Sequence, residues 1–561
     1  NCLAYNINGG DAKMDRFMKV VNRLLWVIFL GMGIYYTWRM FSVPPWYDEL
    51  YTYYYFISRG PVYAAIHWPV PNNHVGYSVL SAFLDFFGNP YIGLRGVSYL
   101  CALINMVLLF LLGRRYFKEG ISLAVVSGYC LLNLVNQLSV QGRGYTLSVT
   151  CFLTAVSMLD VICREERVRK KTYVFFALSL VLGLYTVPSD VYWVIPVCLS
   201  GGIYLLLQAF AEKRSRQGKL IEASAFQKLI RLILVSLLAA FITICLYGII
   251  WLAIGSNLLI KEDPAFQGTG HVQMILRHPF ICVSTGIDYM LATPYIQSVP
   301  KEGFLTKLVT WLQNLFIQYL DGSWWLIPMI VIGGFLALGI RTVIGSRKRR
   351  QLSEEDMKDQ EKEEFTGQTK EKMAGILPLL TVICTLAIPL FLLVQHKLPY
   401  YRVFMYGGAL TALLLGFFLD WILPDDRKKA GYAAFLTVAA FGIWCFATRG
   451  YQNQYSDREH SMQEVLAKGN IEEAQNVCVT DCTQQYLIRF LYGITCENQQ
   501  IEGSDFLLLD RRMADPDFTE MEWEFYHYYN TIPWDYVNTE MEKKYENQNF
   551  ILYTGIREET K

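Results

Sequence analysis

Charged side chains are scarce in this sequence. Asp, Glu, Lys and Arg together make up 18% of its 561 residues, and 53% of the residues are hydrophobic. A soluble globular protein carries about a quarter charged residues. Several apolar runs reach the ~20 residues that a helix needs to cross a bilayer. This composition excludes an ordinary soluble protein and predicts a polytopic α-helical membrane protein.

About eleven transmembrane helices are expected, which places the two termini on opposite sides of the membrane. Lys and Arg set the orientation, because they concentrate on the cytoplasmic side. With the N-terminus in the cytoplasm, 30 of the 50 Lys and Arg residues fall in cytoplasmic segments. We therefore expect a multi-pass protein of the cell membrane with a cytoplasmic N-terminus and an extracytoplasmic C-terminus. The expected spans are residues 21–41, 96–113, 120–138, 145–163, 172–188, 191–211, 230–254, 323–344, 374–394, 403–423 and 430–448.

This topology divides the chain into three parts. Residues 1–20 form a cytoplasmic segment, residues 21–448 form the transmembrane module, and residues 449–561 form an extracytoplasmic domain. The module has two large outer loops, 42–95 and 255–322, and a charged cytoplasmic linker. That linker, residues 345–373, is expected to be solvated. Because the cytoplasmic side otherwise holds only short connectors, we expect any chemistry to take place outside.

Two further absences bear on function. The sequence holds no Asn-x-Ser/Thr sequon, which favours a bacterial protein over one of the endoplasmic reticulum. No strong internal repeat indicates the inverted halves of a transporter.

The tail is polar and charged, in contrast to the module. "AQNVCVTD" and "DFLLLDRR" are typical of short buried strands, and "CTQQYLIRFLYGI" between them is typical of an amphipathic helix. We expect a small α/β domain. Its three cysteines, Cys478, Cys482 and Cys496, allow a disulfide outside the cytoplasm. A zinc site is less favoured, because no His lies close to them in sequence.

The stretch "PPWYDELYTYYYF", residues 44–56, follows the first span and holds two adjacent acids, Asp48 and Glu49, among aromatic residues. Neighbouring residues on a helix do not share a face, so the two acids are expected to do different jobs. One interpretation is a helix cap, because carboxylates are favoured at helix N-termini. The other is a site in which one acid faces a cavity.

The next segments add to the pattern. The loop "PNNH", residues 71–74, lies between two expected interfacial helices, and Arg95 opens the second span. A first span, a "DE" pair, two interfacial helices, this loop and an Arg at the second span together resemble the GT-C superfamily of membrane glycosyltransferases. The resemblance is greatest to the branch of the protein O-mannosyltransferases and the lipid A aminoarabinose transferases. It covers roughly residues 20–425, and the tail is only loosely comparable.

The resemblance implies a fold, a reaction and a site. The enzymes of this branch transfer a sugar from a polyprenyl-phosphate donor on the outer face, and the resemblance implies inversion at the sugar. Their first-loop aspartate corresponds to Asp48, with Glu49 as a supporting acid. The donor phosphate is a good leaving group, so the main need is a base for the acceptor hydroxyl.

The leaving phosphate needs cations, and two outer loops supply them. Arg143 lies between two glycines in "VQGRGYTL", and Lys397 and Arg402 lie in "VQHKLPYYRVFMY". Each is also explained as an ordinary interfacial anchor, but a cationic loop on the outer face runs against the positive-inside trend. We predict that Arg143, Lys397 and Arg402 bind the donor phosphate, with Arg95 as a further candidate. The residues expected to contact the substrates are Tyr51, Asn73, His74, His396 and Tyr401.

No cofactor is expected, although the sequence does not decide whether the protein binds a divalent metal. Some members of the superfamily hold a metal ion with a second carboxylate motif in the next outer loop. No Asp or Glu occurs between Glu119 and Asp160, so that loop has no carboxylate to offer. Asp190, Asp263 and Asp288 lie in other outer loops.

We therefore predict a cell-envelope glycosyltransferase in which Asp48 deprotonates an acceptor hydroxyl. Its partners are a polyprenyl-phosphate-linked sugar, an extracytoplasmic acceptor (a glycan, a lipid or a protein) and the lipid bilayer, with no nucleic acid. The alternative is a polytopic lipid or sugar transporter or flippase without transferase activity. That alternative predicts charges near the bilayer midplane and broken helices in paired halves, whereas the polar clusters here collect on one face.

Overall fold

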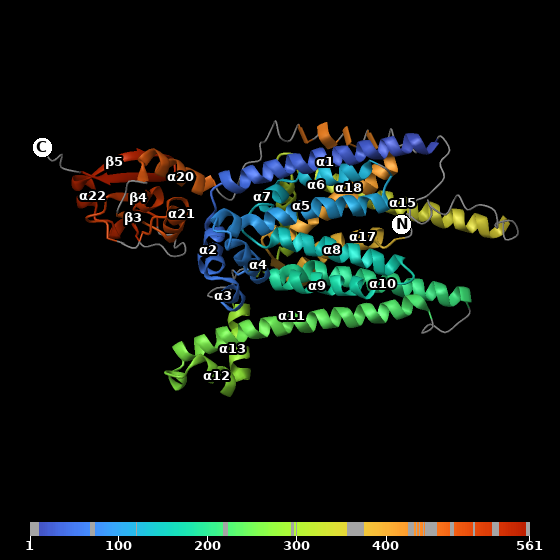
Figure 1. Cartoon of the computed structure of the whole chain (residues 1–561), viewed down its shortest axis with the longest axis horizontal. Coiled ribbons are helices and arrows are strands. Elements are labelled where there is room, and N and C mark those ends of the chain that lie inside the picture. Colours follow the sequence, from blue (N-terminus) through green and yellow to red (C-terminus); the bar gives the residue numbers. More distant parts are fainter. Residues whose placement is uncertain are drawn as a thin grey trace.

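Most of the described chain is helical, and the helices run alongside one another in an elongated bundle (Figure 1). The computed structural model describes residues 10–67, 73–118, 120–216, 223–292, 297–298, 300–355, 375–423, 431–432, 435–436, 438–440, 442–443, 457–471, 476–496, 500–518 and 527–556. The helices up to residue 422 are α1 (Gly10–Ser42), α2 (Tyr47–Tyr55), α3 (Pro61–Ile66), α4 (Val75–Asp85), α5 (Pro90–Tyr116), α6 (Ile121–Cys130), α7 (Asn133–Leu138), α8 (Tyr145–Arg164), α9 (Lys170–Thr186), α10 (Val191–Arg216), α11 (Ser224–Glu262), α12 (His271–Arg277), α13 (Pro279–Ala292), α14 (Phe304–Tyr319), α15 (Leu326–Glu355), α17 (Leu377–Gln395) and α18 (Met405–Ile422).

Seven helices among the described residues are long and apolar enough to cross a membrane. They begin at residues 19, 90, 145, 188, 224, 377 and 401, and each corresponds to one of the expected spans. The prediction of a polytopic helical membrane protein is therefore confirmed. The full count of eleven stays a prediction, and most of its last span, 430–448, lies outside the described residues.

One expected span, 120–138, differs from the prediction because its helix is broken. Residues there form two short helices, α6 and α7, separated by Leu131 and Leu132. The amide of Asn136 donates to the carbonyl of Cys130 at 2.6 Å and to that of Leu132 at 3.2 Å. The first bond gives the Cys130 carbonyl at the end of α6 a side-chain partner. The second adds to the bond that the Leu132 carbonyl already accepts from the backbone N–H of Asn136. The Tyr36 hydroxyl of α1 in turn donates to Asn136 Oδ1 at 3.1 Å.

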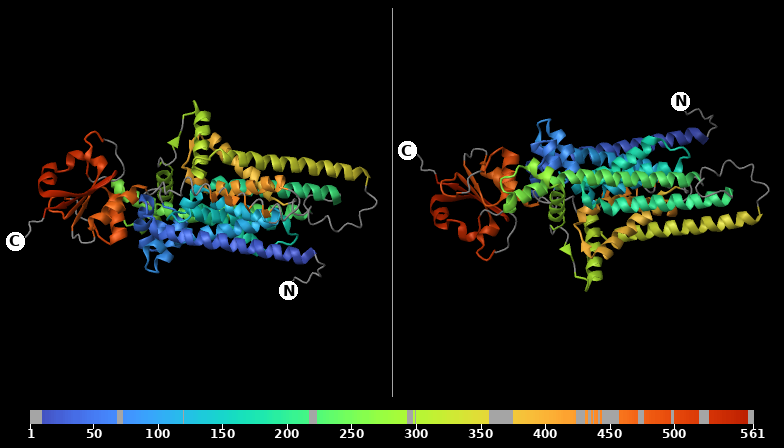
Figure 2. Two further views of the ribbon diagram at one scale, coloured as in Figure 1. Left: turned by 90° about the horizontal axis from the view of Figure 1, so that it is seen from above. Right: turned by 90° about the horizontal axis from the view of Figure 1, so that it is seen from below.

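The short helices of the first outer loop gather at one end of the bundle. α2, α3 and α4 lie there, α12 and α13 project beside that end, and the C-terminal domain lies beyond it (Figures 1 and 2). α5 starts at the same end, where Asn89 Oδ1 accepts the backbone N–H groups of Tyr91 and Ile92 and Pro90 occupies the first turn. The three segments expected on the outer side therefore share one end of the molecule.

The second outer loop is tied to the basic loop that follows α17. Strand β1 (Gln297–Ser298) pairs antiparallel with β2 (Lys397–Leu398). β2 comes directly after His396, where α17 ends in the left-handed conformation with φ 52°. A short 3-10 turn, η5 (Tyr401–Phe404), then leads into α18.

The described part of the C-terminal segment combines helices with one four-stranded sheet. Its sheet has the order β3-β4-β6-β5, with β3 and β4 parallel and the other pairs antiparallel. α21 connects the parallel pair, as such a crossover requires. Cys478 and Cys496 are buried free thiols, and Cys482 is buried as well. The elements are α20 (Asp457–Gly469), β3 (Val477–Val479), α21 (Cys482–Tyr492), β4 (Phe506–Asp510), α22 (Trp534–Glu540), β5 (Met541–Glu546) and β6 (Phe550–Gly555).

Candidate active site

Helix α2 gives the two neighbouring acids opposite surroundings. Its N-cap is Trp46, whose backbone N–H donates to Glu49 Oε2 at 3.2 Å. The cap interpretation of the sequence is therefore correct for Glu49. Asp48, one residue earlier, points to another side of the turn, and its side chain is 16% exposed.

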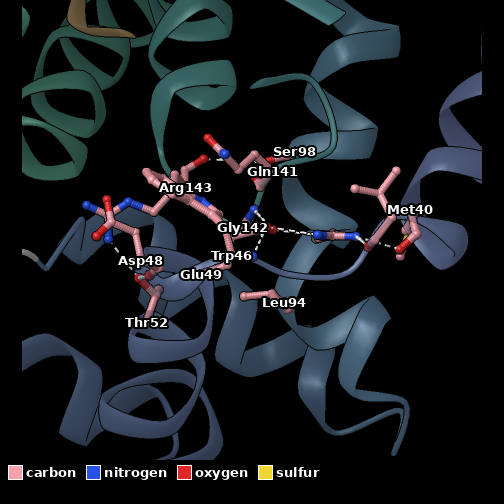
Figure 3. A network of polar contacts seen from close by, with 12 residues as sticks. Met40, Trp46, Asp48, Glu49, Thr52, Leu94, Ser98, Gln141, Gly142 and Arg143 are labelled. Carbon is pink, nitrogen blue, oxygen red and sulfur yellow. Dashed lines mark hydrogen bonds and ion pairs between the residues drawn. The ribbon is translucent and has the colours of Figure 1, made fainter. Parts of the chain in front are cut away.

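Glu49 is the centre of a buried network (Figure 3). Its two carboxylate oxygens accept Arg95 Nε at 2.7 Å and Nη2 at 2.8 Å, and Oε1 also accepts the Gly142 N–H at 2.6 Å. Arg95 Nη1 donates to the carbonyls of Met40 and Val43. A bidentate pair of this kind fixes geometry well. It joins α2 to α5, to the end of α1 and to the loop before α8.

Asp48 forms an ion pair with a residue far away in sequence. Arg402 Nη1 lies 3.0 Å from Asp48 Oδ2. The Arg402 guanidinium also lies over aromatic rings, 5.2 Å from the centroid of Trp46, 5.8 Å from that of Tyr145 and 4.7 Å from that of Tyr400. Cations are attracted to such ring faces. The rings thus hold the guanidinium beside a carboxylate that still reaches solvent.

A second arginine reaches the same turn of α2. Arg143 is 2% exposed, and its Nη1 donates to the Thr52 hydroxyl at 2.7 Å. That hydroxyl donates in turn to the backbone carbonyl of Asp48 at 2.7 Å. Arg143 Nη2 lies 3.2 Å from Nε2 of His74. Arg143 is thereby linked to α2 and, through His74, to the start of α4.

The two glycines beside Arg143 permit this close packing. A Cβ on Gly142 would overlap the Leu94 side chain, and a Cβ on Gly144 would overlap Thr186 and crowd His74. The Gly144 N–H donates to His74 Nδ1 at 2.8 Å. The "GRG" sequence is thus explained by the approach of this loop to α4 and α5.

His74 is held neutral. Burial, together with the positive charges of Arg143 and Arg402, lowers the pKa of His74 well below its ordinary value. Because Nδ1 accepts the Gly144 N–H, the single proton of the neutral ring resides on Nε2. The Nε2–H and Arg143 Nη2 are then two adjacent donors that cannot bond to each other.

The other predicted contact residues lie around this centre in different settings. The Asn73 amide donates to the carbonyls of Ala64 and His67, and its oxygen accepts the Ser78 hydroxyl, so it ties the loop together. Tyr51 is buried and stacks on Tyr55 at 4.2 Å between centroids.

The predicted residues of the basic loop after α17 also differ in their surroundings. Tyr401 packs against Trp311, and His396 packs against Phe304. Lys397 is exposed on β2. Among the described residues, no hydrogen bond or ion pair links Lys397 to Asp48. Of the residues predicted from sequence, Asp48, Arg402, Arg143 and His74 therefore come together around the first turns of α2, and Glu49 and Arg95 form the buried pair beside them.

Several residues that shape the site were not predicted. Thr52 has the helical spacing i+4 from Asp48, which was available in the sequence. Trp46, Tyr145 and Tyr400 hold Arg402, but aromatic residues are too frequent in this chain, at 15%, for three of them to stand out. Within the described residues, no group of three His, Cys, Asp or Glu side chains is placed to hold a metal ion.

Comparison with known proteins agrees with the sequence resemblance. Residues 74–238 match the family described as dolichyl-phosphate-mannose-protein mannosyltransferase. This match supports the resemblance to membrane glycosyltransferases over the part from His74 into the first half of α11, which is less than half of the chain. A comparison with curated proteins finds no significant match.

Two solved structures are distantly similar. One is ArnT from Cupriavidus metallidurans bound to undecaprenyl phosphate, with 10% identity, coverage of 94% of this chain and 98% of that chain, and a TM-score of 0.44. The other is ArnT from Cupriavidus metallidurans in the apo state, with 11% identity, coverage of 94% and 97%, and a TM-score of 0.47.

Proposed function

We propose that this chain is a membrane glycosyltransferase that transfers a sugar from a polyprenyl-phosphate donor to an extracytoplasmic acceptor hydroxyl. The observation that carries the proposal is the convergence at one end of the bundle. A partly exposed carboxylate, Asp48, is paired with Arg402. The helix turn that carries it is bonded to Arg143, which lies against the neutral His74. The family match over residues 74–238 supports the same class of reaction.

The cations suit a phosphate. Arg143 Nη2 and the His74 Nε2–H lie 3.2 Å apart, and one phosphate oxygen could accept hydrogen bonds from both. Arg402 adds a second guanidinium beside them, in contact with Asp48. Charge-assisted hydrogen bonds of guanidinium groups to phosphate are among the strong ones. Arg95 and Lys397 are left out of this group, because Arg95 is engaged with Glu49 and Lys397 is exposed.

Asp48 supplies the base. Its carboxylate accepts the proton of the acceptor hydroxyl as that oxygen bonds to the anomeric carbon of the sugar. The bond from the anomeric carbon to the phosphate oxygen breaks at the same time, and its electron pair leaves with the lipid phosphate. Arg143 and Arg402 stabilise the charge on the leaving phosphate. The proton then passes from Asp48 to solvent.

The ion pair between Asp48 and Arg402 gives an order to these events. Without a donor, Arg402 neutralises Asp48. A bound phosphate competes for the guanidinium and leaves the carboxylate with less compensation, which strengthens it as a base. Donor binding thereby prepares Asp48 for the acceptor.

The test is sugar release from a panel of polyprenyl-phosphate sugars by the purified protein in a lipid bilayer. We expect release of the sugar, with free polyprenyl phosphate as the second product, from at least one donor and only when an acceptor is present. Transport of intact donor between leaflets without cleavage would instead support the flippase alternative. Arg277→Ala, a change of an exposed arginine on α12, serves as the control variant.

A further inference from the structure

One aromatic ring is shared by the two cationic parts of the site. Tyr145 is the first residue of α8, and its ring meets the ring of His74 edge-on, at 4.8 Å between centroids and an interplanar angle of 88°. The Arg402 guanidinium lies 5.8 Å from the centroid of the same ring, within the range of a cation–π contact. Because His74 also contacts Arg143, Tyr145 connects the basic loop after α17 with the loop before α8.

The backbone around Tyr145 is held on both sides. The N–H of Gly144, the preceding residue, donates to His74 Nδ1 at 2.8 Å. Within the first turn of α8, the Ser148 hydroxyl donates to Oδ1 of Asp190, which is 2% exposed, at 2.7 Å. These bonds fix the start of α8 in the absence of a ligand. A group held in this way needs little rearrangement when a charged ligand arrives.

The polar end of this side chain has no partner in the fold. Tyr145 is 6% exposed, and its hydroxyl makes no hydrogen bond among the residues that the structure describes. Other buried tyrosines of the bundle differ, because Tyr77, Tyr319 and Tyr406 each donate to a backbone carbonyl. Most buried polar groups in native proteins have a partner. The Tyr145 hydroxyl is therefore free to bind a ligand.

The groups beside this ring favour an anionic ligand. A tyrosine hydroxyl is a hydrogen-bond donor at neutral pH. The neighbouring groups are donors as well, namely the guanidinium of Arg402 and the Nε2–H of neutral His74, which adjoins Arg143. A ligand that satisfies all of these donors carries several acceptor oxygens and negative charge. Phosphate has both properties.

We propose that Tyr145 is a donor-binding residue, whose hydroxyl donates a hydrogen bond to the phosphate of the polyprenyl-phosphate sugar. This inference rests on the proposed function, since it adds a fourth side chain to the phosphate site formed by Arg143, His74 and Arg402. The ring has a separate role, because it supports His74 and Arg402 through its contacts with both.

Two substitutions separate the hydroxyl from the ring. Tyr145→Phe keeps the ring and its contacts and removes the hydroxyl, whereas Tyr145→Leu removes both. Tyr63→Phe is the matched control. Tyr63 lies on α3, where its ring likewise packs against a histidine, His67, at 4.4 Å, and lies 5.3 Å from the Arg59 guanidinium. This second group of Tyr, His and Arg is not part of the phosphate site.

The binding of two lipids to each purified variant in a lipid bilayer measures the contribution of the hydroxyl. The probes are a polyprenyl phosphate without sugar and the polyprenol of the same length. We expect Tyr145→Phe to weaken binding of the polyprenyl phosphate about tenfold, because one hydrogen bond to a charged group is lost. Its affinity for the polyprenol should stay within about twofold. Tyr145→Leu should weaken binding of the phosphate further, and Tyr63→Phe should change neither affinity.

Thermal unfolding shows whether the hydroxyl acts on the fold instead. Tyr145→Phe should keep the Tm of the parent protein, because its hydroxyl has no partner among the described residues. Tyr319→Phe should lower the Tm, because its hydroxyl donates to the Phe404 carbonyl. A Tm of Tyr145→Phe that falls as far as that of Tyr319→Phe would overturn the proposal in favour of a structural role.

The binding data give the other decisive outcomes. Equal affinity of Tyr145→Phe and Tyr63→Phe for the polyprenyl phosphate would overturn the proposal. An equal loss for the phosphate and the polyprenol would overturn it too, because the hydroxyl would then act on the prenyl chain. If the parent protein binds polyprenyl phosphate but releases no sugar from any donor, the proposed function fails, and the comparison of Tyr145→Phe with Tyr63→Phe still decides the role of Tyr145.

Discussion

Asp48 and Glu49 are adjacent in sequence, yet the fold gives them different chemistry. Glu49 is 1% exposed and is bonded to Arg95, Gly142 and Trp46, whereas Asp48 is 16% exposed and meets Arg402. The alternation of helical faces predicted that their roles differ. It did not predict which acid would be buried, because that depends on where Arg95 and the loop before α8 pack.

The two cations of the basic loop should differ in their effect on donor binding. Arg402 contacts Asp48 and Lys397 is exposed. We expect Arg402→Ala to weaken the binding of a non-hydrolysable donor analogue about tenfold or more, as expected from the loss of a charge-assisted hydrogen bond at ~1.5–3 kcal/mol. Lys397→Ala should change it less than about twofold, and Arg402→Lys should rescue only part of the loss, because Lys lacks the planar fork.

Titration of the analogue against each folded variant measures this difference. An equal loss in Arg402→Ala and Lys397→Ala would place the exposed lysine in the phosphate site, as the sequence predicted. Wild-type affinity in Arg402→Ala would remove the phosphate site.

At the scale of elements, the sequence predicted what composition and periodicity encode. Long apolar runs predicted the main spans. In the tail, two short apolar runs predicted strands, and the amphipathic run between them predicted a helix. The break between α6 and α7 was missed, because it depends on Asn136 reaching back to the carbonyls of Cys130 and Leu132. The tyrosines of α2 were interpreted as part of a site, whereas Tyr53, Tyr54 and Tyr55 face α21. Which segment packs against an aromatic helix face depends on the tertiary structure, so the local sequence pattern does not predict it.

The contact between α2 and α21 leads to a prediction about Phe490. Its buried ring contacts Tyr53 and Tyr91, and truncation of a buried Phe to Ala typically lowers stability by about 3–5 kcal/mol. We expect Phe490→Ala to loosen the docked domain and to speed hydrogen exchange over residues 47–55. Phe518→Ala, which removes a ring stacked on Tyr528 in the same domain, should leave that segment unchanged. Equal exchange in the two variants would contradict the docking role.

The large polar segments of the molecule lie at one end of the helical bundle. The first outer loop and the C-terminal domain lie together there, while the ion pairs of Asp160 with Arg115 and of Asp420 with Arg341 lie near the ends of α8 and α18 that face away from it. The charge bias of the sequence predicts that this end lies outside the cytoplasm. Ion pairs at helix ends, rather than at mid-span, agree better with a transferase than with a transport pathway.

Labelling on intact cells tests this orientation. Val62→Cys and Ile556→Cys replace exposed residues of the first outer loop and of the tail, and Arg167→Cys replaces a residue between α8 and α9. A membrane-impermeant maleimide should label the first two on intact cells and the third only after permeabilisation. Labelling of position 62 and position 556 from opposite sides would contradict the topology.

The most direct test of the central claim, that Asp48 is the base, is single-turnover transfer by Asp48→Asn with donor already bound. The amide keeps the shape of the side chain but cannot accept the proton of the acceptor hydroxyl. We predict a loss of about 10²–10⁴-fold in the transfer rate, with donor affinity equal to or above that of the parent protein, because a negative charge next to the phosphate site is removed. A transfer rate close to that of the parent protein would show that Asp48 is not the base.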